Sequence, residues 1–244
     1  MPDDRTAFVT GGTGAVGAAI VRCLAEQGSR VAFSYYQQAD KARALETELG
    51  AKNRTAKGYA LDVLDAAGVN RLAEQIEREL GPVDVLVNNA GVTLVMPFAM
   101  IEEADWDRLM DVNVKGMFLV TKAFVRAMIR RKTGSIVNLG SLAGVRLLEV
   151  PVHYATAKSA VVGFTLSLAS ELSRYGVRVN AVVPGLLAGG VSDNVPDKQR
   201  ADYLAHCAAR RAGKPEEVAE LVAFLAGDRA SYINAQVIQI DGGI

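Results

Sequence analysis

The chain has 244 residues, half of them apolar, and its 27 basic and 27 acidic side chains give a formal net charge of zero. A chain of this length can bury a large core without disulfides. The balanced charge argues against a nucleic acid as the main partner, because phosphate binding needs a clustered basic face. Cys23 and Cys207 stand far apart without metal-ligand spacing, which predicts free thiols and no metal site. No signal segment and no run of about 18 apolar residues is present, so we expect a cytoplasmic protein without a membrane span.

Short apolar strands alternate with helical patterns along the whole chain. Strands are predicted at about 6–10, 30–36, 58–62, 83–89, 135–141, 177–183 and 236–241. Helices are predicted at about 15–27, 40–49 and 66–80, within 103–130, and at 152–174. Continuous apolar strands separated by helices are typical of a parallel sheet covered on both faces. We therefore predict an α/β fold that forms one domain over residues 1–244.

The least regular region is expected at about 186–212, directly after Pro184 and Gly185. Turn-forming residues gather there, namely Gly189, Gly190, Asp193, Asn194 and Pro196. A loop of this length in a compact domain is usually a lid or a binding segment. We predict a mobile flap over a substrate site.

A glycine-rich turn, VTGGTGAVG at 9–17, joins the first strand to the first helix. Glycines permit a tight turn, and the helix N-terminus offers amide donors and a positive dipole end to a pyrophosphate. Plain strand-to-helix turns are also glycine-rich, so the pattern alone leaves both interpretations open. Its position after the first strand of an alternating chain favours a dinucleotide site.

Tyr154 and Lys158 lie four residues apart in YATAK, so they share one face of a helix. A free phenol has a pKa near 10, and a nearby ammonium favours the phenolate. We therefore expect Lys158 to lower the pKa of Tyr154 toward the neutral range, where acid–base catalysis is most effective. The alternative is an amphipathic tyrosine at the edge of the core beside a solvated lysine.

Several short motifs, taken in order, resemble the short-chain dehydrogenase/reductase family. They are TGGTGAVG, NNAG at 88–91, NVKG at 113–116, the Gly-Ser pair at 140–141, YATAK and VNAVVPG at 179–185. The match runs over nearly the whole chain, and as a set it is highly specific. The resemblance implies a Rossmann-like, doubly wound parallel sheet of about seven strands, NAD(H) or NADP(H) as cofactor, and a homotetramer or homodimer.

The resemblance assigns a catalytic role to Asn113, Ser141, Tyr154 and Lys158. Tyr154 would be the proton donor, and Lys158 would also bond the nicotinamide ribose. Ser141 would bind the substrate oxygen, and Asn113 would hold a water that relays protons to the lysine. The residues expected to bind the cofactor are Gly11, Gly12, Thr13, Gly14, Val16, Tyr35, Tyr36, Asp62, Val63, Asn89, Ala90, Gly91, Tyr154, Lys158, Pro184, Gly185 and Leu187.

Some of these assignments compete with plainer roles. Asp62 could cap a turn instead of contacting the adenine. Asn88 is expected mainly to tie strand ends together. His153 and His206, the two histidines of the chain, are interpreted as non-catalytic because neither occupies a catalytic position of the family.

The second strand ends at Tyr35 and Tyr36, where a carboxylate would bind the ribose 2′-hydroxyl and repel a 2′-phosphate. Without that carboxylate the sequence favours NADP(H) over NAD(H). Lys41 and Arg43 could reach the phosphate, or could be ordinary exposed helix charges. Two residues depart from the family pattern: Ala15 replaces the middle glycine, and Gly189 stands where the family often has a threonine that holds the nicotinamide amide.

The length, RRAGKPEEVAELVAFLAGD at 210–228 and the ending QVIQIDGG resemble 3-oxoacyl-[acyl-carrier-protein] reductases and stand-alone polyketide ketoreductases. This resemblance implies NADPH-dependent reduction of a β-ketoacyl thioester, in fatty acid or polyketide biosynthesis. Acyl carrier proteins are acidic, so a basic patch beside the cleft would help docking, with Arg130, Arg131, Lys132 and Arg174 as candidates. Basic residues are also favoured at any helix end. Two alternatives stay open: a dehydrogenase of a free alcohol, sugar or steroid, and a non-catalytic nucleotide-binding scaffold.

Overall fold

One seven-stranded parallel sheet organises the molecule. The structure, a computed structural model, describes residues 5–244 apart from the side chain of Val191. The strands lie side by side in the order β3-β2-β1-β4-β5-β6-β7. They are β1 (Thr6–Val9), β2 (Arg30–Tyr35), β3 (Ala56–Ala60), β4 (Val83–Asn88), β5 (Gly134–Leu139), β6 (Val177–Pro184) and β7 (Val237–Ile240). The expected α/β fold, doubly wound and Rossmann-like, is confirmed.

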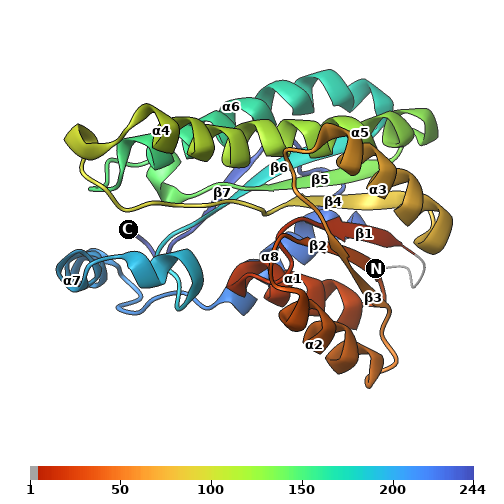
Figure 1. Cartoon of the computed structure of the whole chain (residues 1–244), viewed down its shortest axis with the longest axis horizontal. Helices are drawn as coiled ribbons and strands as arrows, with labels where there is room; N and C mark the ends of the chain where they lie inside the picture. The colour runs from red at the N-terminus through yellow and green to blue at the C-terminus, as the bar shows by residue number, and fades with distance from the viewer. Residues whose placement is uncertain (1–4) are drawn as a thin grey trace.

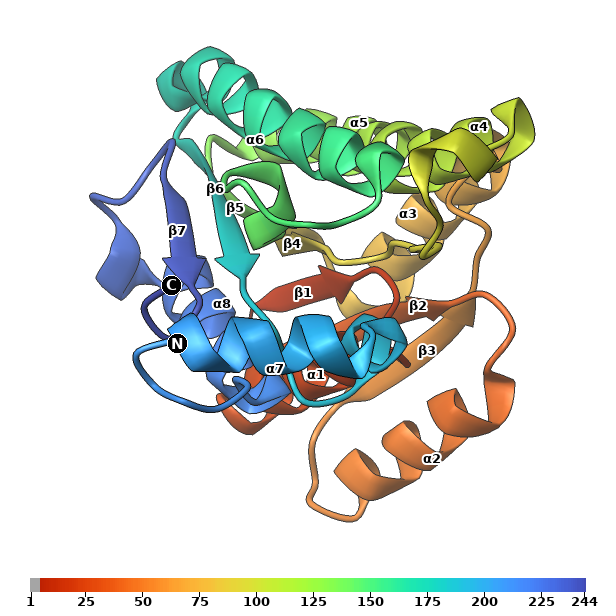
Figure 2. The ribbon, with the colours of Figure 1, turned by 90° about the vertical axis from the view of Figure 1, so that its left-hand side faces the viewer.

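Helices cover both faces of this sheet (Figure 1). One layer holds α1 (Ala15–Glu26), α2 (Ala39–Gly50) and α8 (Pro215–Ala226). The other layer holds α3 (Ala66–Leu80), α4 (Glu103–Met110), α5 (Met117–Arg131) and α6 (Val152–Leu172). A further helix, α7 (Asp197–His206), crosses in front of the strand ends in Figure 2.

The core lies in two layers because alternate strand residues point to opposite faces of the sheet. Val9 points into the layer of α1 and α8, where Leu24 and Val222 are fully buried. Phe8, its neighbour on β1, points into the other layer, where its ring centroid lies 4.9 Å from that of Phe124. Both faces of the central strands are therefore dry, which explains their continuous apolar sequences.

Three helical segments differ from the sequence prediction. The region 186–212 is not one irregular loop, because it contains the short helix η5 (Gly190–Asn194) and α7. No residue of α7 is buried, so it lacks the apolar period that reveals a packed helix. The helix α8 was absent from the predicted elements. The predicted helical stretch 103–130 is interrupted by a π-helical turn, η2 (Asp111–Gly116), which carries Asn113. None of the described helices is long and apolar enough to cross a membrane.

Candidate active site

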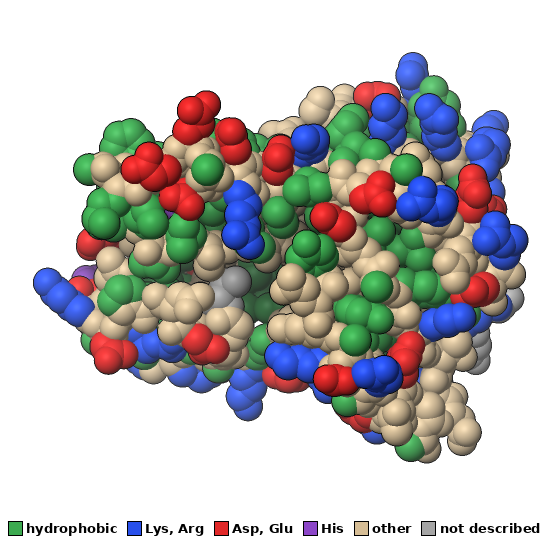
Figure 3. All heavy atoms as spheres, in the orientation of Figure 1, with side chains coloured by type: hydrophobic (Ala, Val, Ile, Leu, Met, Phe, Trp, Pro, Cys, Tyr) green, Lys and Arg blue, Asp and Glu red, His purple; other side chains and the backbone are tan. Residues whose placement is uncertain are grey.

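A cavity of about 1160 Å³ opens at the carboxyl ends of the strands. Its walls come from the turn after β1, the residues that follow β2, β4, β5 and β6, the start of α6, and the segment after Pro184. Figure 3 shows the surface hollowed between the two helical layers. In an open parallel sheet this edge is where ligands bind.

The glycine-rich turn after β1 is held in its conformation by hydrogen bonds with Asn89 and Ala90. Gly11 has φ +66°, and a Cβ there would lie 3.0 Å from the Cα of Ala90. The Asn89 side-chain amide donates to the carbonyls of Thr10 and Gly11 at 2.9 and 3.1 Å. The Thr10 hydroxyl accepts from the backbone N–H groups of Asn89 and Ala90, each at 3.0 Å. The side chain of Asn89 therefore shapes the turn.

All but one of the residues predicted to bind the cofactor line this cavity. The lining members are Gly11, Thr13, Gly14, Val16, Tyr35, Tyr36, Asp62, Val63, Asn89, Ala90, Gly91, Tyr154, Lys158, Pro184, Gly185 and Leu187. Gly12 is absent from the lining, and a Cβ at Gly12 would lie 2.6 Å from the Cβ of Phe33. Gly12 is therefore required for packing against β2, and its contact with the cofactor stays a prediction.

The corner beyond β2 is polar but carries no cation from α2. Tyr35, Tyr36 and Gln37 line it, and Tyr36 is 66% exposed. Lys41 and Arg43 are not among the lining residues, and Arg43 pairs with Asp40 on its own helix. Across the corner, the Asp62 carboxylate accepts the backbone N–H of Leu64 at 2.9 Å. Asp62 thus caps a turn and lines the cavity at once.

Asn113 presents an unpaired acceptor to the cavity. Its side-chain amide donates to the carbonyls of Val92 and Leu109 at 2.9 and 3.0 Å, while Oδ1 is buried without a partner among the described residues. A Cβ at Gly91 would lie 2.5 Å from that oxygen and 3.8 Å from Lys158 Nζ. Glycine at position 91 keeps this space open. An orphan acceptor beside an open cradle fits a bound hydroxyl or water, so the residues present suit a nicotinamide dinucleotide.

Lys158 is fixed beside Tyr154 at the first turns of α6. Its Nζ donates to the Leu139 carbonyl at 2.9 Å and lies 5.8 Å from the centroid of the Tyr154 ring. Burial lowers the pKa of Lys158 to about 8. The ammonium is therefore charged at neutral pH but close to its titration range. The two side chains share one face of the helix and one cavity, as predicted.

The pKa of Tyr154 is raised rather than lowered. Burial of the phenol is the larger influence, and the hydrogen bond with the Ser141 hydroxyl lowers the pKa by less. The prediction that the pKa of Tyr154 is lowered is therefore wrong, because desolvation of the phenol is the dominant influence on it. Tyr154 keeps its proton at neutral pH, which suits a proton donor.

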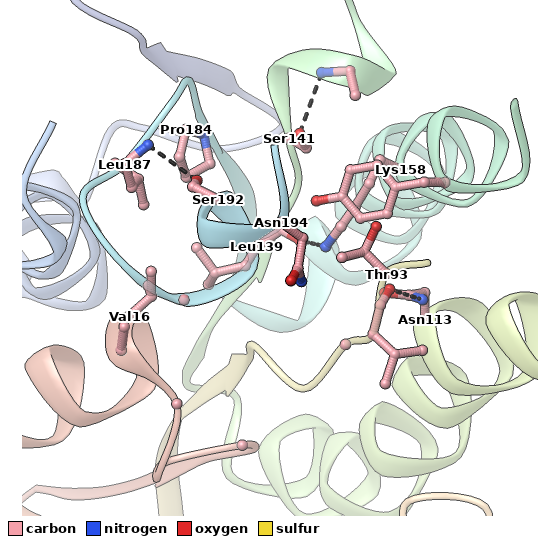
Figure 4. Close-up of a pocket in the computed structure, with 18 of the residues that line it drawn as sticks. Val16, Thr93, Asn113, Leu139, Ser141, Lys158, Pro184, Leu187, Ser192 and Asn194 are labelled. Carbon is pink, nitrogen blue, oxygen red and sulfur yellow. Dashed lines mark hydrogen bonds between the residues drawn. The ribbon is translucent and has the colours of Figure 1, made fainter. Parts of the chain in front are cut away.

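Ser141 completes the group at the end of β5. Its hydroxyl oxygen accepts the backbone N–H of Ala143 at 3.2 Å, so its hydrogen stays available to another acceptor. Figure 4 shows Ser141, Lys158 and Asn113 reaching the cavity from three different elements. The hydroxyls of Ser141 and Tyr154 can together bind a carbonyl oxygen and donate a proton to it.

A family model described as Enoyl-(Acyl carrier protein) reductase matches residues 12–244. The chain belongs to the short-chain dehydrogenase/reductase family. It is 36% identical over 242 residues to the 3-oxoacyl-[acyl-carrier-protein] reductase FabG of Escherichia coli K12, covering 99% of this chain and 98% of that one. The same-named protein of Thermotoga maritima is 35% identical over 242 residues, with the same coverage. A crystal structure titled gox2181 is 31% identical and superimposes with a TM-score of 0.93, over 98% of this chain and 95% of that one.

This short-chain dehydrogenase/reductase is thus an NAD(P)-dependent oxidoreductase. Its two departures from the family pattern, Ala15 and Gly189, lie near each other. A Cβ at Gly190 would lie 3.3 Å from the Ala15 methyl, and one at Gly189 would lie 4.0 Å from it. Both glycines have positive φ, +89° and +72° in chain order. The segment after β6 therefore passes closely over the first residue of α1.

Sequence reasoning missed one wall of the dehydrogenase cavity. The residues Arg108, Ser192, Asn194, Gln199, Asp202, Tyr203, His206 and Ile244 also line it. Those of α7 recur at positions i, i+3, i+4 and i+7 from Gln199, a helical face that could have been found had α7 been predicted. His206 lines the cavity, whereas His153 is fully buried outside the lining, and its ring nitrogens lack partners among the described residues.

The basic residues predicted to dock a carrier protein do not border the cleft of the same chain. Arg130, Arg131 and Lys132 end α5 just before β5, and Arg174 follows α6 just before β6, so they lie at the amino edge of the sheet. The 21 residues of α6, about 30 Å of helix, separate Arg174 from the cavity. In Figure 3 basic side chains gather at the upper right, away from the hollow. Arg131 is moreover bound to the Val83 carbonyl at 2.6 Å.

Proposed function

We propose that this enzyme reduces a β-ketoacyl thioester, carried on an acyl carrier protein, to the β-hydroxyacyl thioester with NADPH. The observation that carries the proposal is that Ser141, Tyr154 and Lys158 line one dinucleotide-sized cavity, with the Lys158 Nζ 5.8 Å from the centroid of the Tyr154 ring. The names of the relatives with 35–36% identity over the whole chain support this choice of substrate.

The bound cofactor would supply the hydride, and the chain would supply its binding groups. The turn of Gly11 and Gly14, with the N-terminus of α1, would hold the pyrophosphate. Lys158 and the open side of Gly91 would accommodate the nicotinamide ribose. The absence of a carboxylate on Tyr35 and Tyr36 favours NADP(H), and NAD(H) is the alternative.

Proton transfer would follow from the positions of three side chains. Ser141 donates a hydrogen bond to the ketone oxygen and holds it near the phenol. As that oxygen becomes an alkoxide, the Tyr154 O–H bond breaks and the proton forms the new alcohol O–H bond. The ammonium of Lys158 favours the phenolate left behind, and a water between Lys158 Nζ and Asn113 Oδ1 would return the proton.

One part of the cavity wall is apolar and suits an acyl chain. Leu148, Val150, Pro151 and Val95 line it. One observation favours a second candidate, a dehydrogenase of a free hydroxylated compound: Gln199, Asp202 and His206 on α7 face the same cavity. We also expect a homodimer or homotetramer, as in the family.

Oxidation of NADPH and NADH should be followed with acetoacetyl thioesters of carrier protein and of a short thiol, and the reverse reaction with simple alcohols and sugars. The proposal predicts turnover of the carrier thioester, faster with NADPH than with NADH. Turnover of free alcohols alone would select the second candidate. A chain that binds NADPH but turns over no ketone or alcohol would be a nucleotide-binding scaffold.

A further inference from the structure

Ser192 is a buried hydroxyl on the segment that borders the cavity after β6. It is 8% exposed, lies in η5 and lines the cavity. Its Oγ accepts the backbone N–H of Leu187 at 3.2 Å, and its backbone carbonyl accepts from the Arg200 guanidinium at 2.7 Å. The position of this side chain is therefore fixed from two sides.

The hydrogen of the Ser192 hydroxyl is not used within the described part of the chain. Its oxygen is an acceptor toward Leu187, and none of the described residues accepts its O–H. Buried hydroxyls normally donate as well as accept, because an unmade hydrogen bond in a desolvated place is costly. A donor held this rigidly at a cavity wall indicates an acceptor oxygen on the ligand.

The position of Ser192 in the cavity indicates which ligand oxygen would accept this hydrogen bond. Figure 4 shows Ser192 beside Pro184 and Leu187, across the cavity from Lys158. Under the proposed function, the nicotinamide ring must lie between the proton donor beside Lys158 and this wall for a hydride to reach the ketone. The polar substituent of that ring is an amide, whose oxygen is a hydrogen-bond acceptor.

We propose that Ser192 is a positioning residue whose hydroxyl donates a hydrogen bond to the nicotinamide amide oxygen. This bond fixes the rotation of the ring about its bond to the ribose, and with it the face that the ring turns toward Tyr154. The inference rests on the proposed cofactor and adds the residue that orients it.

Dissociation constants without substrate test the assignment with two ligands, NADPH and 2′-phospho-ADP-ribose, which lacks the nicotinamide. Ser192→Ala should weaken NADPH binding about tenfold, as expected for one buried hydrogen bond, and change 2′-phospho-ADP-ribose binding less than twofold. Ser192→Thr, which keeps a hydroxyl, should restore NADPH binding. Asp193→Ala is the matched control, because Asp193 lies in the same short helix but is exposed and outside the cavity lining, and it should alter neither constant more than twofold.

The two ligands also separate positioning from a structural role. Equal weakening of both by Ser192→Ala would overturn the assignment, because it would place the effect at the pyrophosphate or in the backbone held through Leu187. Unchanged NADPH binding would overturn it as well. A wild-type chain that binds neither ligand would refute the proposed cofactor. That outcome is distinct from failure of the Ser192 assignment, which is judged from the variants.

Discussion

The reacting residues show how burial and charge compete over one phenol. Spacing predicted that Lys158 would acidify Tyr154, but desolvation of the phenol raises its pKa and outweighs the opposing hydrogen bond with Ser141. The same desolvation lowers the pKa of Lys158 to about 8. The two shifts favour a protonated tyrosine beside a charged lysine at neutral pH, which is the state required for reduction of a ketone.

Gly91→Ala tests the space between Asn113 and Lys158. The added methyl would lie 2.5 Å from Asn113 Oδ1, so it should block the proposed water and lower kcat by about 100-fold, the usual scale of an assisted proton transfer. Gly163→Ala on α6 is the control, because a Cβ there meets nothing within 4 Å. Steady-state kinetics of both variants, with thermal unfolding as a check of folding, give the answer. An unimpaired kcat in Gly91→Ala would refute the relay.

Lys158→Met should abolish turnover yet stabilise the fold at pH 7. The pKa of Lys158 in the folded state is about 8, below the ordinary 10.5, so the buried charge lowers the stability of the native state below pH 8. Wild-type stability should rise between pH 8 and 10.5, where the unfolded chain binds the extra proton. The methionine variant should gain about 1–3 kcal/mol at pH 7, after allowing for the lost bond to Leu139, and this gain should vanish above pH 10.5.

Urea unfolding of the wild type and Lys158→Met at pH 7 and pH 10.5 measures that difference. A methionine variant that is less stable at pH 7, or a gain of equal size at both pH values, would contradict the buried-charge account.

At the scale of elements, the strands that carry the site are joined by a buried polar chain. The Asn88 amide of β4 donates to Thr121 on α5 at 2.9 Å and to Asn138 on β5 at 2.8 Å. Asn138 in turn donates to Thr165 on α6 at 2.9 Å. This confirms that Asn88 ties elements together. These hydrogen bonds fix the position of α6, and therefore of Tyr154, relative to the sheet.

Asn138→Ala should destabilise the fold by about 2–3 kcal/mol, because the buried Asn88 amide and Thr165 hydroxyl would each lose a hydrogen-bond partner that water cannot replace. Ser135→Ala on the same strand is the control, since Ser135 makes a single bond, to the Leu225 carbonyl at 3.2 Å. Its cost should be about 1 kcal/mol. Equal losses in the midpoints of denaturant unfolding would show that the polar chain adds nothing beyond one hydrogen bond.

Elements with a packed face could be predicted from the sequence, and elements without one could not. Strands such as β6 are buried on both faces and read as apolar runs. The helix α7 buries no residue, so its pattern is polar and was interpreted as a loop. The motif residues of the site lie around one cavity. Ser192 belongs to no motif, and the helical spacing of the α7 wall has meaning only once α7 is known to be a helix. The role of Gly12 could not be predicted either, because it depends on Phe33, a residue of another strand.

At the scale of the whole molecule, the outer side of α5 and α6 exposes large apolar side chains among basic and small polar ones. Phe118 on α5 is 44% exposed and Leu166 on α6 is 43% exposed. Exposed large apolar side chains often mark a contact with another protein, so we expect a second copy of the chain to cover these two.

Light scattering at micromolar concentration should therefore give two or four times the chain mass of 25.9 kDa. Leu166→Asp should shift the mass toward one chain, since an unpaired charge at a buried contact is costly. Leu147→Asp, at a fully exposed residue, should leave the mass unchanged. A monomeric wild type would refute the expected homo-oligomer.

The central claim is that Tyr154 gives its proton to a ketone oxygen that receives a hydride. The most direct measurement compares the wild type with Tyr154→Phe in single-turnover reduction of an acetoacetyl thioester, after NADPH binding has been measured for both. The account predicts that the variant binds NADPH within about twofold of the wild type and loses at least about 1000-fold in the rate of NADPH oxidation. A variant that oxidises NADPH at the wild-type rate would contradict it.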